Sequence, residues 1–157
     1  MSSYKKFFMF VFIFLMGLTR VFAVSNDATP IGYWKTIDDV TGKPKSIIQI
    51  WKTSDHILMG KVIHIYPKPG EDQTKRCDAC QGALHNQPVV GMVILSGLKS
   101  ETKQWGHGRI LDPENGKTYS CSLRVSENGA KLNVHGYIGI PLFGRSQTWE
   151  RVDQMTG

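Results

Sequence analysis

Apolar side chains occupy every second position in two successive segments of the second half of the chain. The first segment has Tyr119, Cys121, Leu123 and Val125, and the second has Leu132, Val134, Gly136 and Ile138. Such alternation is typical of strands with one buried face and one solvated face. Asn128-Gly129 separates the two segments and Asn115-Gly116 precedes the first, and Asn-Gly supplies the positive φ angles of tight hairpin turns. The pattern therefore predicts a β-meander.

The chain after residue 30 also divides into short stretches rich in β-branched and aromatic residues, separated by Gly, Pro, Asn and Asp. The predicted strands are 32–36, 46–53, 57–66, 89–96, 104–111, 117–126, 130–138 and 145–152. Eight strands in series predict an all-β fold, a single closed antiparallel up-and-down β-barrel. Residues 47–51 and 57–60 are apolar on both faces, so periodicity alone does not assign their inward sides.

The N-terminus has the features of a secretory signal peptide. Two lysines precede an uncharged apolar run, residues 7–18, and Val21-Phe22-Ala23 offers small or modest residues at the cleavage positions. A membrane anchor is the alternative, but the run holds 12 residues, whereas a spanning helix needs about 20. We expect a signal peptide at 1–23, a mature domain at 24–157 in the periplasm or secreted, and no membrane span after cleavage.

The net charge changes when this leader is set aside. The whole chain has 19 Lys and Arg against 13 Asp and Glu, a formal charge of +6. Residues 1–23 include three basic residues and no acidic residue, so the mature chain keeps 16 basic and 13 acidic residues, or +3. The basic residues form no stripe interleaved with aromatic residues, so the sequence predicts no nucleic-acid binding.

All three cysteines lie in the mature chain, two of them as Cys77-Asp78-Ala79-Cys80 in the long connection 67–88. The favoured interpretation is a disulfide between Cys77 and Cys80 that staples this loop. The alternatives are a redox centre with an exposed thiolate, a zinc site with His85 as a third ligand, and an unpaired or intermolecular state. Cys121 lies on the apolar face of its strand and is expected to be a small buried residue; a bridge from it to the loop stays open.

The sequence has no recognisable catalytic or metal-binding constellation. Its five histidines are dispersed, and His107, between two glycines, is expected to be a hydrogen-bonded strand residue beside a bend in the barrel. No G-x-S-x-G or comparable signature frames a nucleophile, and the carboxylate pairs Asp38-Asp39 and Glu71-Asp72 fall in predicted turns or loops. We therefore predict no catalytic residue, no metal and no cofactor.

Several motifs resemble those of the DUF2147 family. They are Gly32-Tyr33-Trp34-Lys35-Thr36 with Asp38-Asp39, Trp105-Gly106-His107-Gly108-Arg109-Ile110-Leu111-Asp112-Pro113, Gly116-Lys117-Thr118-Tyr119, Gly136-Tyr137-Ile138-Gly139, and Gly144-Arg145-Ser146-Gln147-Thr148-Trp149-Glu150-Arg151. The likeness covers nearly the whole mature chain. It implies a small exported bacterial protein with a barrel similar to that of lipocalins, and it implies no reaction.

The Gly32-x-Trp34 pattern is also similar to the lipocalin signature on the first strand. In lipocalins this tryptophan plugs the closed end of the barrel and is covered by an arginine from a late strand, an arrangement favoured by burial and cation–π attraction. The resemblance implies that Arg151 or Arg145 takes this part here.

These observations favour a barrel that binds a small lipophilic or amphipathic molecule in its interior. The candidate ligand-binding residues are Trp34, Trp105, Tyr137, Arg145, Gln147 and Trp149. Arg145 or Gln147 would meet a polar head, and the loop 67–88 would form a rim or lid. The alternative is a packed barrel that serves as an envelope-structural or protein-interaction module; a thiol-redox protein is the third hypothesis. Interior volume separates the first two, because large inward side chains would leave no room for a ligand.

Overall fold

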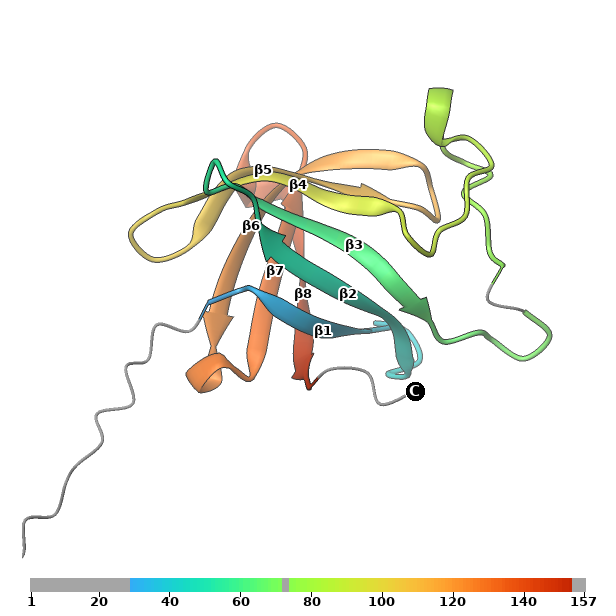
Figure 1. The fold of residues 1–157 in the computed structure, drawn as a ribbon, viewed down its shortest axis with the longest axis horizontal. Helices are drawn as coiled ribbons and strands as arrows, with labels where there is room; N and C mark the ends of the chain where they lie inside the picture. The colour runs from blue at the N-terminus through green and yellow to red at the C-terminus, as the bar shows by residue number, and fades with distance from the viewer. Residues whose placement is uncertain (1–28, 72–73, 154–157) are drawn as a thin grey trace, which may run out of the picture.

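The computed structural model describes residues 29–71 and 74–153, which form a closed eight-stranded antiparallel barrel (Figure 1). The strands are β1 Gly32–Ile37, β2 Pro44–Lys52, β3 Leu58–Ile65, β4 Val93–Ser100, β5 Trp105–Asp112, β6 Lys117–Ser126, β7 Lys131–Tyr137 and β8 Gly144–Val152. Each strand pairs with its neighbours in the chain, and β1 also pairs with β8. The predicted all-β up-and-down barrel is therefore confirmed. The predicted signal peptide, 1–23, lies outside the described residues.

Helical structure is confined to three short 3₁₀ turns in the described part of the chain. They are η1 Gly82–Leu84, η2 Glu127–Gly129 and η3 Pro141–Phe143. No helix within the described ranges is long and apolar enough to span a bilayer.

The up-and-down connectivity separates the connections into two groups at opposite ends of the barrel. One end has the short turns 53–57, 101–104 and 127–130 together with the start of β1 and the end of β8. The other end has the connections 38–43, 66–92, 113–116 and 138–143. Figure 1 shows that the longest of these latter connections, 66–92, extends well beyond the strands. We call the first the closed end and the second the open end.

The inward faces follow the predicted alternation in the second half of the chain. Cys121 and Leu123 of β6 and Leu132 and Val134 of β7 are all buried in one core cluster. The structure also assigns the inward face of β2. Ile48 and Ile50 belong to this cluster, and a register irregularity follows Ile47. Both Asn-Gly turns are present, with positive φ at Gly116 and at Asn128 and Gly129.

Two expectations about strand boundaries are wrong. The strand predicted at 89–96 is β4, Val93–Ser100, because Val89 and Met92 fill the core from a loop that turns at Gly91, where φ is 92°. Burial rather than strand pairing explains their apolar character. The alternation places Ile138 on the buried face, but β7 ends one residue earlier and this side chain is 66% exposed.

A single arginine covers the closed end. Trp34 is fully buried, and its indole N–H donates to the carbonyl of Pro30 at 2.7 Å. The Arg151 guanidinium lies 4.2 Å from the centroid of the Trp34 ring. Its nitrogens donate to the carbonyls of Thr29, Ile31 and Gly129 at 2.6, 2.9 and 2.5 Å. Of the two candidate arginines, Arg151 therefore covers this tryptophan.

Replacing Arg151 by Met should lower the free energy of unfolding by about 2–3 kcal/mol. The variant keeps the aliphatic stem but loses the cation–π contact and three charge-assisted hydrogen bonds, partly compensated by water at this half-exposed site. Urea unfolding monitored by tryptophan fluorescence measures the difference. Lys35→Met, which removes one partly exposed ion pair with Glu150, is the control and should cost less than about 1 kcal/mol. Equal effects of the two substitutions would contradict the proposed role of Arg151.

Candidate functional site

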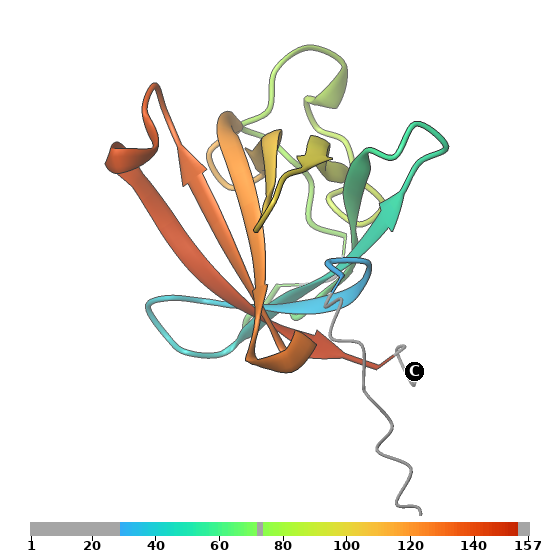
Figure 2. The same cartoon turned by 90° about the vertical axis from the view of Figure 1, so that its left-hand side faces the viewer.

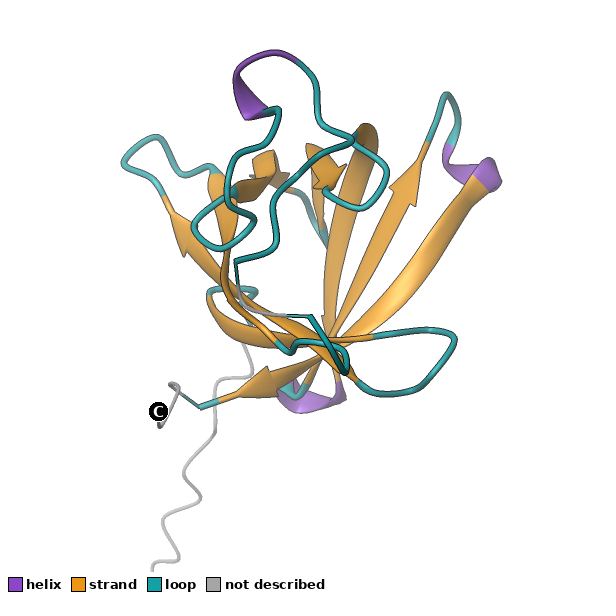
Figure 3. Cartoon of the chain, turned by 90° about the vertical axis from the view of Figure 1, so that its right-hand side faces the viewer, coloured by secondary structure: helices purple, strands orange, loops and turns teal. Residues whose placement is uncertain are grey.

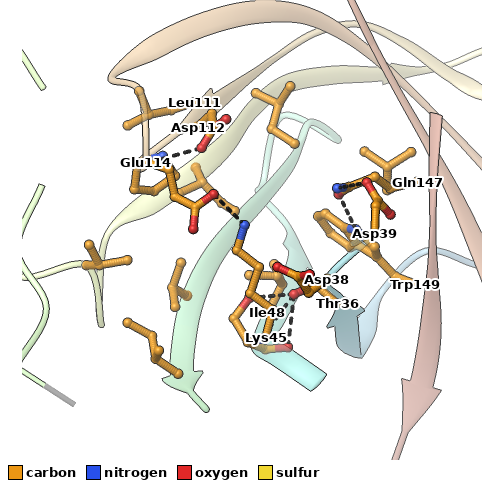
Figure 4. A pocket seen from close by; sticks show the side chains of 18 of the residues that line it. Thr36, Asp38, Asp39, Lys45, Ile48, Leu111, Asp112, Glu114, Gln147 and Trp149 are labelled. Atoms are coloured by element: carbon orange, nitrogen blue, oxygen red, sulfur yellow. Dashed lines mark hydrogen bonds and ion pairs between the residues drawn. The ribbon is translucent and has the colours of Figure 1, made fainter. Parts of the chain in front are cut away.

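A cavity of about 440 Å³ opens between the loops of the open end (Figure 4). Its deeper wall is apolar and includes Ile48, Val62, Ile65, Val89, Ile94, Ile110, Leu111, Val134 and Trp149. Its mouth is lined by charged and polar residues from all of the open-end loops except 138–143 and from the adjoining strand ends. An apolar interior with polar groups at one end matches the usual character of small-molecule sites.

One side of the mouth is held by a chain of hydrogen bonds that starts inside the cavity. The Trp149 indole donates to the Gln147 amide oxygen at 3.3 Å, and the Gln147 amide donates to the Asp39 carboxylate at 2.9 Å. The same carboxylate oxygen accepts from Arg145. These donors, Gln147 first and then Arg145, outweigh burial and lower the pKa of Asp39. The loop 38–43 is thereby tied to β8 across the mouth.

The opposite side of the mouth is held by lysines around one glutamate. Lys45 of β2 donates to Glu114 at 2.8 Å, and Lys75 of the long loop lies 3.7 Å from the other carboxylate oxygen. Partial burial raises the pKa of Glu114, but Lys45, Lys75 and Lys68 outweigh this effect and leave it lowered. Glu114 is therefore an ionised junction between β2, the long loop and the β5–β6 turn.

The disulfide Cys77–Cys80 anchors the long loop against the barrel. Both cysteines are almost fully buried and belong to the core cluster. A Cβ atom at Gly116 would overlap the Ala79 carbonyl, so the disulfide turn rests directly on the β5–β6 turn and only glycine fits there. The predicted loop-stapling disulfide is confirmed, and its loop forms one wall of the cavity through Val89.

The alternatives that need free thiols at this loop do not fit the structure. The sulfurs of Cys77 and Cys80 are bonded to each other, and a ring nitrogen of His85 contacts the Cys80 carbonyl oxygen at 3.0 Å. The described ranges contain no group of three His, Cys, Asp or Glu side chains placed to hold a metal ion. Redox catalysis requires an accessible sulfur, and both are covered here.

A search of protein-family models matches residues 32–151 to DUF2147, described as an uncharacterized protein conserved in bacteria. The chain belongs to the DUF2147 family. No curated protein matches it. Among solved structures, it is similar to protein HP1028 from the human pathogen Helicobacter pylori, which belongs to the lipocalin family. The two chains share 20% sequence identity, and the superposition has a TM-score of 0.68 over 80% of this chain and 84% of HP1028. At this identity, the likeness establishes a shared lipocalin-like fold.

The DUF2147 barrel separates the six predicted ligand-binding residues into two groups. Arg145, Gln147 and Trp149 lie on the inward face of β8 and line the cavity. Trp34 is at the closed end under Arg151. The other two also lie away from the cavity. Trp105 packs against the core cluster, and Tyr137 stacks on His135 at the outer face of β7, with ring centroids 5.6 Å apart.

Two acidic residues that form ion pairs at the mouth are not predicted as site residues from the sequence. The pattern places Asp39 in a solvated turn and does not single out Glu114, because their partners are 106 and 69 residues away in the chain. His107 lies beside an irregularity of the barrel, where it was predicted to lie. It lies in the irregular β5–β6 pairing between Trp105 and Gly108, with its ring 3.1 Å from Glu101.

The remaining thiol of the DUF2147 barrel, Cys121, should be unreactive in the folded protein. Its side chain is fully buried, and burial raises its pKa from the ordinary value of 9.0 to about 12. The thiolate that reacts with Ellman's reagent is therefore scarce at neutral pH. We expect no label in the native protein, one labelled cysteine after unfolding in urea, and three after unfolding and reduction.

The direction of this pKa shift also sets a pH dependence of stability. Because the folded state binds the thiol proton more tightly, the contribution of Cys121 is fully present below about pH 9 and is lost as the pH rises toward 12. Cys121→Ala provides the control, since it removes the titrating group. In the labelling experiment with Ellman's reagent, rapid reaction of the native wild-type protein would contradict the predicted protection and would show that this part of the barrel opens readily.

Proposed function

We propose that this protein is a non-catalytic, exported barrel that binds a small lipophilic or amphipathic molecule in the cavity at its open end. The observation that carries the proposal is the cavity itself, about 440 Å³ with an apolar deep wall. This volume falls in the range of about 300–1,000 Å³ found for small-ligand sites. A barrel filled by its own side chains would lack such a space, so the volume favours ligand binding over a packed structural module.

A glycine at the cavity wall creates part of this space. Gly136 faces the cavity from β7, between the inward positions of β6 and β8. A Cβ atom added at Gly136 would make only ordinary contacts, the nearest with Ile110 at 3.5 Å. A methyl group therefore fits at this point of the wall without displacing a neighbour. The Trp149 ring also lines the cavity and offers an apolar surface for a ligand.

Binding would proceed by burial of the apolar body and pairing of the polar head. Each Å² of apolar surface removed from water contributes roughly 25 cal/mol, so the apolar wall supplies most of the affinity. Arg145 would meet the head, because its guanidinium lines the mouth and remains largely exposed while paired with Asp39. The cysteine-bearing loop would act as the rim through Lys75 and Lys68.

Two features support an oxidising, extracytoplasmic location. The N-terminal sequence has the order of charges and apolar residues of a signal peptide. The disulfide Cys77–Cys80 is part of the core cluster, and structural disulfides persist mainly in secreted and periplasmic proteins. We infer a periplasmic or secreted protein that meets its ligand outside the cytoplasm.

Filling the cavity should abolish binding without unfolding the barrel. Gly136→Leu would project a large apolar side chain into the cavity from a position where a Cβ fits, whereas Gly136→Ala leaves most of the volume open. Native mass spectrometry of protein purified from its own compartment, followed by organic extraction, should detect a bound molecule in wild type and the Ala variant. The Leu variant should run at its bare mass with an unchanged circular dichroism spectrum.

Two results would contradict the proposed ligand binding. One is wild-type protein that always runs at its bare mass and shows no thermal shift with fatty acids, phospholipids or isoprenoids. The other is a Leu variant that retains the ligand of the wild type, which would place the bound molecule elsewhere. In either case the packed-module alternative would gain support.

The pairing of Arg145 with Asp39 predicts opposite effects of two substitutions at the mouth. Asp39→Asn weakens the competing ion pair and should strengthen binding of a fatty acid several-fold, whereas Arg145→Gln removes the cation and should weaken it. Neither change should alter binding of a fatty alcohol of the same chain length, because the alcohol carries no charge. Titration calorimetry at low and high salt measures the four combinations. Equal effects on the acid and the alcohol would show that Arg145 does not meet the head.

A further inference from the structure

The connection between β7 and β8 presents an unusual group of exposed apolar side chains. Within the described residues, ten large hydrophobic side chains are exposed, and four of them lie in this one short loop. Ile138, Ile140, Leu142 and Phe143 are 66, 55, 81 and 75% exposed. A contiguous exposed apolar patch on a soluble domain usually marks an interaction surface. We call residues 138–143 the apolar tip.

The apolar tip is held in a defined shape rather than left loose. The Pro141–Phe143 turn is closed by a hydrogen bond from the Phe143 N–H to the Ile140 carbonyl at 3.2 Å. His135 of β7 braces it from below, with one ring nitrogen 2.8 Å from the Pro141 carbonyl oxygen and the other 2.9 Å from the Ser146 hydroxyl. The exposed side chains are therefore displayed on a supported turn.

The tip also stands beside the opening of the cavity. It ends at Phe143, and Arg145, two residues further along the chain, lines the mouth. Figures 2 and 3 show the tip at the end of the β7–β8 hairpin, projecting past the barrel wall and separate from the cysteine-bearing loop. Anything that binds the tip is thus brought close to the cavity mouth.

We propose that the apolar tip inserts into the surface of a lipid bilayer and so places the open end of the barrel against the membrane. The tip protrudes, and a protruding apolar turn can enter a fluid lipid surface without a complementary socket. Residues 136–144 contain no charged residue, so insertion leaves no charge to be desolvated. Docking there would let an amphipathic molecule pass between the bilayer and the cavity, a role that rests on the proposed ligand binding.

The residues that flank the tip fit the lipid headgroup layer. Tyr137 precedes the tip, and tyrosine favours the boundary between water and hydrocarbon because its ring is apolar and its hydroxyl is polar. Arg145 follows it with a largely exposed side chain, placed to meet lipid phosphates. Residues 24–157, the domain after the expected signal peptide, keep 16 basic and 13 acidic residues, and this modest positive charge complements an anionic lipid surface.

Vesicle cosedimentation tests the proposal directly. The purified protein should bind vesicles of phosphatidylethanolamine and phosphatidylglycerol, and a Leu142→Ser, Phe143→Ser double variant should bind them roughly tenfold or more weakly, because two exposed apolar anchors are lost. Binding should persist at high salt, since insertion is apolar. A Phe143→Trp variant should show a blue-shifted emission with vesicles and should be quenched by brominated lipids.

Matched controls separate this proposal from misfolding and from loss of the cavity ligand. Ile31→Ser and Val93→Ser change exposed apolar residues outside the tip and should leave vesicle binding unchanged. The tip variant should keep its melting temperature and its ligand binding in vesicle-free solution, so that failure here is distinguishable from failure of the proposed ligand binding. Wild-type protein that does not sediment with vesicles, or a tip variant that sediments like wild type, overturns the proposal. A dimer that the tip variant converts to monomer, without vesicle binding, would overturn it in favour of a self-association surface.

Discussion

The contact between the Trp34 indole and the Arg151 guanidinium closes one end of the barrel, and the rest of the structure depends on that closure. Arg151 joins the segment before β1, the β6–β7 turn and the last strand through three carbonyls and one ring. These segments are far apart in the sequence and meet where β1 pairs with β8. Because this end is sealed by packed side chains, the remaining interior space can open only at the other end.

The two ends differ in the kind of interaction that holds them. The closed end rests on buried aromatic surface and charge-assisted hydrogen bonds to backbone carbonyls. The open end is held largely by ion pairs at the surface, such as Arg145 with Asp39 and Lys45 with Glu114. Exposed pairs contribute little, about 0–1 kcal/mol each, so loops there can separate without unfolding the strands. The disulfide limits this freedom on one side by fixing the long loop to the β5–β6 turn.

The fold could be predicted from the sequence mainly where one strand face is polar. In β6 and β7 the alternation and the Asn-Gly turns agree, so both strands and their inward faces were identified. Val89 and Met92 misled the prediction of β4, since a loop residue that fills the core has the same apolar character as a strand residue. The two candidate arginines could not be separated by sequence either. Which arginine covers Trp34 and which lines the cavity depends on the register of β8 with β1 and β7. This register pairs Arg151 with Trp34 and Arg145 with Gly136.

The same limit explains why three of the six predicted ligand-binding residues line the cavity, while Asp39 and Glu114 at its mouth were not predicted. Residues 145, 147 and 149 alternate on one strand and are local in sequence, whereas Asp39 and Glu114 act only through contacts made by barrel closure. In the proposed function, those acidic residues would determine which polar contacts the mouth offers to a ligand. A purely apolar molecule can enter without disturbing the pairs, but an anionic head must take Arg145 from Asp39. The net gain from the head is then a difference between two similar ion pairs, so selectivity should come mostly from the shape of the apolar wall.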